Sequence, residues 1–178
     1  NEDQRKGGYP KSMVSVQGIY QGNGLQKETP RLCVKSERPN TSALNLLFVN
    51  PPSPDQFTYY RDTNRSGRRS KAGEIWPQAG LALFAGLYPK DNVRIIDCIA
   101  ERMSYSKLYE EMKSFKPDWV FFNPVSCTIT SDMYVAYLAK LLGAKTVAIS
   151  PHLKALKGES ADRFRYLDHV IDHVKFGP

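Results

Sequence analysis

The sequence is poor in cysteine and has no long apolar run. Its three cysteines, Cys33, Cys98 and Cys127, lie far apart and form no Cys-x-x-Cys pair. This spacing indicates neither a zinc site nor a disulfide framework, and free thiols are typical of a cytoplasmic setting. No apolar run approaches about 18 residues, so no membrane span is expected. The N-terminal segment, "NEDQRKGGYPKS", lacks the apolar core of a signal peptide, and we therefore expect a soluble cytoplasmic protein.

Phosphate-binding loops and common catalytic motifs are also missing. The first expected strand is followed by "NPPSPDQF", without a Gly-x-Gly-x-x-Gly or Walker lysine loop, which argues against a nicotinamide or nucleoside-triphosphate site. That loop offers only Ser53 and Thr58 as hydroxyls for a flavin mononucleotide. A receiver domain is rejected because the third strand ends in Asn123, not in a phosphorylatable aspartate. Asp97 and Glu101 follow the second strand, but no partner at a diagnostic spacing supports acid–base catalysis.

The excess positive charge is concentrated in one segment. The formal net charge is +7, and residues 61–71, "RDTNRSGRRSK", contain five of the 25 basic residues. Such a run is most often solvated surface. Binding of nucleic acid or of an acidic partner through this run is the minority interpretation, and it predicts binding that weakens steeply with salt.

Strand and helix patterns alternate from residue 44 onward. Compact apolar runs predict strands, and apolar residues at helical spacing predict helices between them. Ser104 is expected to cap a helix whose inner face carries Leu108, Met112 and Phe115, and Gly143 is expected to end a later helix. The predicted strands are 44–50, 93–99, 118–124, 145–150 and 169–176, and the predicted helices are 74–88, 104–115, 132–143 and 159–168.

This alternation predicts a flavodoxin-like, doubly wound, five-stranded parallel sheet flanked by helices. Residues 1–43 are polar and rich in Gly, Pro, Ser and Asn, and we interpret them as a flexible arm or linker preceding an α/β domain over 44–178. Ligands of such sheets bind past the carboxyl ends of the strands. That rule selects four segments: 50–60, 97–103, 123–132 and 150–158.

A hydroxyl-rich loop, "PVSCTITSD" (124–132), follows the third strand. If the loop is extended, alternate residues point the same way, so Ser126, Thr128 and Thr130 would face one pocket together. The alternative is that Ser131 or Thr130 caps the next helix and the other hydroxyls meet solvent. His152 is either a ligand or an ordinary surface residue, whereas His169 and His173 are assigned structural roles.

The order of these motifs over residues 44–178 resembles the cobalamin-binding-like domain at the N-terminus of many radical SAM enzymes. The resemblance is carried by "LNLLFVNPP", "WPQAGLALFAGL", "VRIIDCI", "KPDWVFFNPVSCTIT", "KTVAISPHLKAL" and "VIDHVKFGP". It implies a corrinoid held at the carboxyl edge, with its dimethylbenzimidazole tail enclosed by Ser126, Thr128 and Thr130 and its nucleotide beside the turn after the fourth strand. The residues expected to bind the cofactor are Asn50, Pro51, Asp97, Ser126, Thr128, Thr130, Ser150, Pro151 and His152.

The sequence departs from this family in two motifs. The Asp-x-His-x-x-Gly motif after the first strand is absent, so a bound cobalamin would lack that imidazole as its lower ligand. The paired glycines of the fourth-strand turn, which let the backbone approach a ligand closely, are Ser150 and Pro151 here. The alternative function is therefore a cofactor-free docking or substrate-presenting domain with the same fold.

The family continues into a catalytic barrel whose Cys-x-x-x-Cys-x-x-Cys triplet holds a [4Fe–4S] cluster beside S-adenosylmethionine. This sequence has no such triplet. We therefore expect no catalysis and no metal ligand from this chain alone. Its expected partner is the radical SAM barrel of a parent methyltransferase or cyclase.

Overall fold

The computed structural model describes residues 43–55, 57–61, 67–150, 153 and 164–171. Within this part the strands form one all-parallel sheet in the order β2-β1-β3-β4-β5. This is the predicted flavodoxin-like α/β architecture. The strands are β1 (Asn45–Asn50), β2 (Asn92–Asp97), β3 (Trp119–Phe122), β4 (Lys145–Ile149) and β5 (His169–Ile171). Nearly all of the proposed arm, 1–43, lies outside the described residues.

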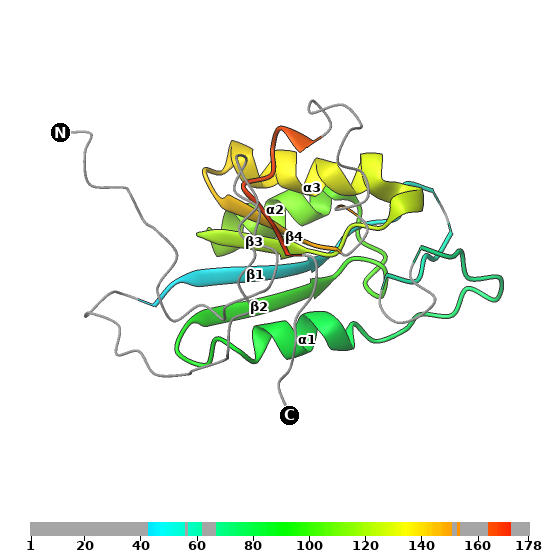
Figure 1. Cartoon of the computed structure of the whole chain (residues 1–178), viewed down its shortest axis with the longest axis horizontal. Coiled ribbons are helices and arrows are strands. Elements are labelled where there is room, and N and C mark those ends of the chain that lie inside the picture. The colour runs from blue at the N-terminus through cyan, green and yellow to red at the C-terminus, as the bar shows by residue number, and fades with distance from the viewer. Residues whose placement is uncertain (1–42, 56, 62–66, 151–152, 154–163, 172–178) are drawn as a thin grey trace, which may run out of the picture.

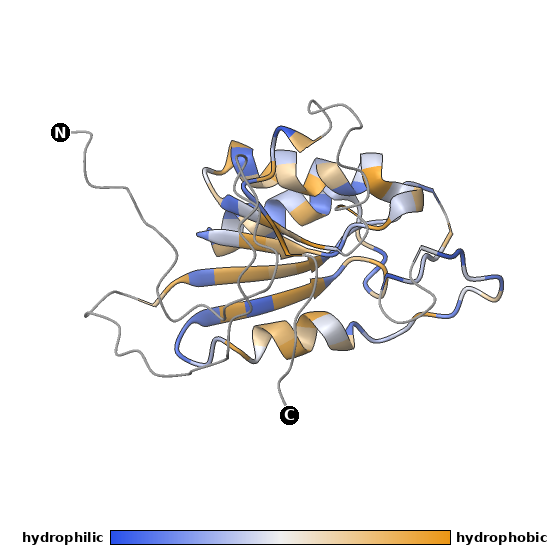
Figure 2. Ribbon diagram, in the orientation of Figure 1, coloured by the Kyte–Doolittle hydropathy of each residue, from blue (hydrophilic) through white to orange (hydrophobic). Residues whose placement is uncertain are grey.

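Helices cover both faces of the sheet. α1 (Ala79–Ala85) lies on one face, and α2 (Tyr105–Phe115) and α3 (Ile129–Leu141) lie on the other (Figure 1). Figure 2 shows the resulting hydropathy, with apolar strands in the middle and polar loops at the strand ends. The continuous apolar strands are explained by this arrangement, because both faces of each central strand are removed from water.

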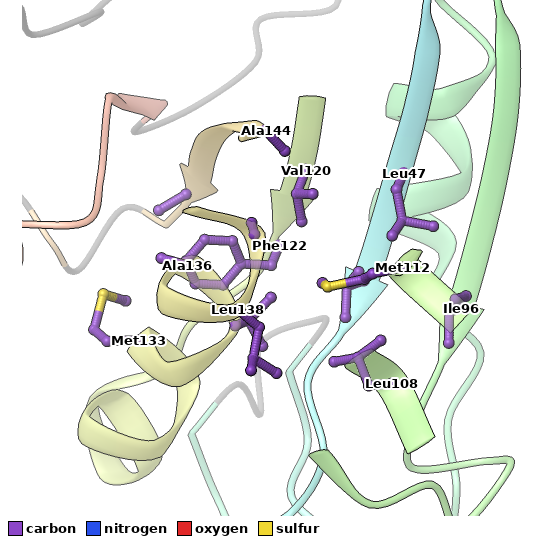
Figure 3. Packing of buried hydrophobic residues seen from close by; sticks show 14 of the residues in the cluster. Leu47, Ile96, Leu108, Met112, Val120, Phe122, Met133, Ala136, Leu138 and Ala144 are labelled. Carbon is purple, nitrogen blue, oxygen red and sulfur yellow. The ribbon is translucent and has the colours of Figure 1, made fainter. Parts of the chain in front are cut away.

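Alternate residues of β1 and β3 enter two separate cores. Leu47 and Phe122 pack toward α2 and α3, whereas Phe48 and Phe121 pack toward α1. Phe48 and Phe121 are register partners, and their rings stack with centroids 4.6 Å apart. In the larger core, Leu108 and Met112 of α2 lie near β1 and β2, and Ala136 of α3 lies beside Phe122 (Figure 3).

α2 follows its sequence prediction closely. The Ser104 side chain accepts a hydrogen bond from the Lys107 N–H at 3.2 Å, which confirms the predicted N-cap. Leu108 and Met112 are fully buried and Phe115 packs against the same core. α3 ends as expected at Gly143, where φ is +76° and the Ala144 N–H donates to the Ala139 carbonyl, a Schellman arrangement.

Three of the predicted helices differ from the structure. The helix expected over 74–88 is only α1, because Trp76 precedes Pro77 and is biased toward extended backbone, and Gly86 follows the last helical turn. α3 begins at Ile129, not at residue 132. Residues 159–163 of the last predicted helix lie outside the described residues, and 164–168 form a turn, closed by the Leu167 N–H on the Phe164 carbonyl at 2.9 Å.

Candidate functional site at the carboxyl edge

The carboxyl ends of β1 and β2 meet in register at Asn50 and Asp97. The Asn50 amide donates from Nδ2 to Asp97 Oδ1 at 2.7 Å. The same carboxylate oxygen accepts from the backbone N–H groups of Ile99, at 3.0 Å, and Ala100, at 3.1 Å. Two of the predicted site residues are therefore brought together, and Asp97 ends its strand by folding the next residues into a turn.

A buried ion pair lies at the end of β3. Arg61, from the segment after β1, donates from a guanidinium nitrogen to Asp132 Oδ2 at 2.6 Å, and neither side chain is exposed to solvent. The same nitrogen donates to Thr128 Oγ1 at 2.9 Å, while the Thr128 hydroxyl donates to Asp132 Oδ2 at 2.7 Å. The Val125 N–H also donates to Asp132 Oδ2, at 3.0 Å. Burial raises the pKa of the Asp132 carboxyl, and the Arg61 charge and these donors oppose that rise.

Arg61 fills the crevice between β1 and β3, where the winding of the sheet reverses. Its second guanidinium nitrogen lies 3.4 Å from the Pro52 carbonyl oxygen, and its own carbonyl oxygen lies 3.5 Å from Asn123 Nδ2. Asn123 Nδ2 also donates to Gln78 Oε1 at 2.9 Å. The segments before α1 thus close over the position where ligands of doubly wound sheets usually bind.

The hydroxyl-rich loop is not extended, so its predicted geometry is wrong. Ser126 to Thr128 form a 3₁₀ turn that leads directly into α3. In this turn Thr128 is buried, whereas Ser126 and Thr130 are exposed, and the three hydroxyls do not face one pocket. The reason is local: Asp132 accepts from the N–H of Val125, seven residues earlier, and holds the chain in a helical start.

The capping alternative is also wrong in its residues. α3 begins at Ile129, so Thr130 and Ser131 lie inside its first turn and do not precede it. The Ser131 hydroxyl donates to the Thr128 carbonyl at 2.8 Å and so does not accept from the helix N–H groups.

Buried oxygens without a hydrogen-bond partner occur along the ends of three neighbouring strands. They belong to residues that are at least nine-tenths buried, namely Asn50 of β1, Asn123 after β3 and Ser150 after β4. The amide nitrogens of both asparagines are used as donors, which leaves their oxygens as acceptors. Asp132 Oδ1 lacks a partner as well. Because buried polar atoms are nearly always paired, these oxygens are candidate acceptors for a polar group bound at this edge.

The remaining predicted site residues divide into two sets. Pro51 is buried directly after β1. Pro151 and His152 lie outside the described residues.

An open pocket lies beside this row, past the end of β2. Its volume is about 570 Å³, and it adjoins a second hollow of about 460 Å³ with which it shares Phe57, Thr58 and Gly73. The larger pocket is lined by Ser53, Asp55, Phe57, Thr58, Gly73, Ile75, Cys98, Ile99, Arg102 and Met103.

The described residues at this edge give little support for a reactive thiol, a metal site or a basic binding surface. Burial raises the pKa values of Cys98 and Cys127, which disfavours a reactive thiolate at either position. The described residues hold no cluster of three metal-ligating side chains, and none of their helices has the length and apolarity to cross a membrane. Arg61 is buried, so it does not belong to a basic surface with Arg68, Arg69 and Lys71.

Sequence reasoning missed Arg61 and Asp132 as site residues. Arg61 opens a basic run, and nothing in its neighbourhood distinguishes it from the other arginines of that run. Asp132 was visible as the last residue of "PVSCTITSD", where an acid in the first turn of a helix has an ordinary explanation.

Three kinds of comparison bear on identity: protein-family models, curated proteins and solved structures. None matches this chain.

Proposed function

We propose that this chain is the corrinoid-binding domain of a radical SAM enzyme and that it holds the cofactor over the carboxyl edge of its sheet. The observation that carries the proposal is the row of buried, unpartnered oxygens on Asn50, Asn123 and Ser150. Strand order supports it, because β1, β3 and β4 are neighbours and their ends form one continuous edge.

The chemistry of these oxygens suits a corrinoid. The rim of a corrin ring carries carboxamide groups, whose N–H donors match a row of carbonyl and hydroxyl acceptors. The Asn50 and Asn123 amides are held by their hydrogen bonds to Asp97 and Gln78, so these two oxygens are oriented before any ligand arrives. When bound, the corrinoid supplies a cobalt centre for methyl or radical chemistry in the parent enzyme, and this chain supplies binding and orientation.

The nucleotide tail is a harder fit than the ring. The resemblance assigns Thr128 to the tail, but its hydroxyl already donates a hydrogen bond to Asp132 and accepts one from Arg61. Ser126 is exposed and has no such commitment to that ion pair. We therefore assign the ring contacts to the strand-end oxygens, and a tail between β1 and β3 would require Arg61 to leave the crevice.

Ser150→Ala tests the proposal with little risk to the fold. Its Oγ is buried without a partner, so removing it leaves stability unchanged or slightly improved. Retention of hydroxocobalamin after desalting, read from the visible spectrum, should fall about 2- to 10-fold, the value of one hydrogen bond. Ser114→Ala, on the exposed side of α2, is the matched control and should retain as much corrinoid as wild type. Equal retention by Ser150→Ala and wild type would contradict the role of this row.

The second candidate is a cofactor-free docking or substrate-presenting domain, and the buried Arg61–Asp132 pair favours it. The chain's own ion pair already occupies the crevice between β1 and β3. The double variant Arg61→Met/Asp132→Leu separates the candidates, since it removes both charges and keeps apolar volume. If neither wild type nor the double variant retains hydroxocobalamin, the docking function replaces the corrinoid function. Retention by wild type, or a gain of retention in the double variant, supports the corrinoid function.

A further inference from the structure

The pocket beside the end of β2 is large enough to hold a small molecule. Its volume of about 570 Å³ falls within the range of roughly 300–1,000 Å³ that is usual for such sites. Phe57, Ile75 and Met103 provide apolar lining, and the Ser53 hydroxyl oxygen is buried there without a hydrogen-bond partner. None of these residues belongs to the set that the resemblance assigns to a corrinoid.

Arg102 stands at this pocket in a conformation that costs energy. Its φ is +49°, in the left-handed region that residues other than glycine and asparagine rarely adopt. The turn 98–103 holds it there through the Glu101 N–H on the Asp97 carbonyl at 3.0 Å and the Met103 N–H on the Cys98 carbonyl at 2.8 Å. Its guanidinium is exposed and forms no ion pair with any described residue.

A second residue shows that this conformation has an ordinary structural use elsewhere in the chain. Lys116 has φ of +54°, and it is the left-handed C-cap of α2, whose N–H donates to the Met112 carbonyl. Arg102 has a comparable use, since its N–H donates to the Ile99 carbonyl at 3.3 Å and the Met103 N–H to the Cys98 carbonyl, the bond pattern of a Schellman turn. A glycine would suit this position better, so the arginine there is retained at a cost in backbone energy.

The geometry points to a second ligand site here, for a small molecule with an apolar body and an anionic head of the carboxylate or phosphate-monoester type. The body contacts Phe57, Ile75 and Met103. The Ser53 hydroxyl and the Arg102 guanidinium bind the head, because an unpaired guanidinium at the rim of a pocket presents several N–H donors to an oxyanion. Asp55 also lines the pocket, and its two oxygens accept from the Phe57 N–H and the Tyr59 hydroxyl, so the anionic head belongs at Arg102 and away from this carboxylate.

The test uses the full chain with 1-naphthyl phosphate and 1-naphthoate as probes and neutral 1-naphthol for comparison. Binding is followed by amide chemical shifts in ¹⁵N–¹H spectra. At least one anionic probe should bind more tightly than 1-naphthol and shift amides of the lining residues, and the better of the two identifies the head group. Arg102→Gly should raise its Kd about 10- to 100-fold, as expected for a charge-assisted hydrogen bond, while the melting temperature stays the same or rises.

Lys116→Gly is the matched control. It removes the same charge from the same backbone conformation, at the end of α2 that lies against the start of β1 and not at the carboxyl edge. It should leave the Kd unchanged. Equal effects of the two glycine variants, equal binding of 1-naphthol and the anions, or shifts outside the lining would overturn the site. Displacement of the bound probe by hydroxocobalamin would also overturn it, since the pocket would then belong to the corrinoid site.

Discussion

At the scale of single residues, the described part of the chain has a fully buried ion pair in a position where doubly wound sheets place ligands. Arg61 and Asp132 come from segments 71 positions apart and share their bonds with Thr128 and the Val125 N–H. Removing two charges from water is costly, and the surrounding donors offset that cost only while both partners are present. The pair therefore specifies one arrangement of the loop after β1.

Breaking this pair on one side should be more damaging than removing it entirely. Arg61→Met leaves Asp132 buried without its counter-charge, and we expect a loss of about 3–5 kcal/mol in the free energy of unfolding. Arg61→Met/Asp132→Leu should recover most of that loss. Urea unfolding followed by tryptophan fluorescence measures both, with the exposed Arg165→Met as a control that changes little. A double variant less stable than Arg61→Met would show that the charges themselves hold the fold.

At the scale of elements, the end of a helix was predictable where a residue at that end determines the local backbone conformation by itself. Ser104 and Gly143 mark the start of α2 and the end of α3 because a hydroxyl acceptor and a left-handed glycine act locally. The start of α3 was not predictable, because it depends on Asp132 bonding Val125 and Arg61, and Arg61 is distant in sequence. The geometry predicted for the hydroxyl-rich loop is wrong for the same reason. Alternation of side-chain directions requires an extended chain, whereas the contacts of Asp132 with Val125 and Arg61 hold this loop in a helical start.

The α2 cap gives a direct test of such a local signal. Ser104→Ala removes the acceptor for the Lys107 N–H and should lower the free energy of unfolding by about 1 kcal/mol. Ser114→Ala, exposed on the same helix, should be neutral or slightly stabilising because alanine favours a helix interior. Chemical denaturation of the two variants side by side decides the matter. Equal losses would mean that serine content, not the cap, governs this helix.

At the scale of the whole molecule, the sequence predicted the parallel sheet and the edge at which a site must lie. It did so because apolar strands such as β1 and β3 are buried on both faces, and crossover helices separate them. The contents of the edge were harder to predict. The unpartnered oxygens of Asn123 and Ser150 and the hollow beside Arg102 arise from how loops fold over the strand ends, which no local pattern encodes.

Global stability should fall in acid, partly through Asp168. Burial alone would raise the pKa of this carboxyl, but hydrogen bonds from Lys140 and from the Thr146 N–H outweigh burial and hold it below its ordinary value of 3.8. The stabilisation is therefore complete above pH 3.8 and is lost as the pH falls through the lower, folded-state pKa. Asp168→Asn should flatten the fall of melting temperature below pH 4, relative to wild type.

The control for this pH effect is Glu110→Gln, an exposed carboxyl on α2 without an ion pair among the described residues. It removes the same charge from a chain whose net charge is already +7. If Glu110→Gln reduces the fall of melting temperature below pH 4 as much as Asp168→Asn does, the effect comes from overall charge repulsion and not from the Asp168 contacts.

The central place of β1 in an all-parallel sheet has a consequence for biosynthesis. β1 leaves the ribosome first among the strands but pairs with β3, and Asn45 and Asp118, which join their starts, are 73 positions apart. At about 5–20 residues per second, its partner follows roughly 4–15 s later. β2 emerges earlier and can pair with one edge of β1, but the edge that β3 will cover stays unpaired throughout that interval. Synthesis of this fold therefore includes a period in which a nascent chain needs protection from association, and slowing translation between β1 and β3 should lower the soluble yield.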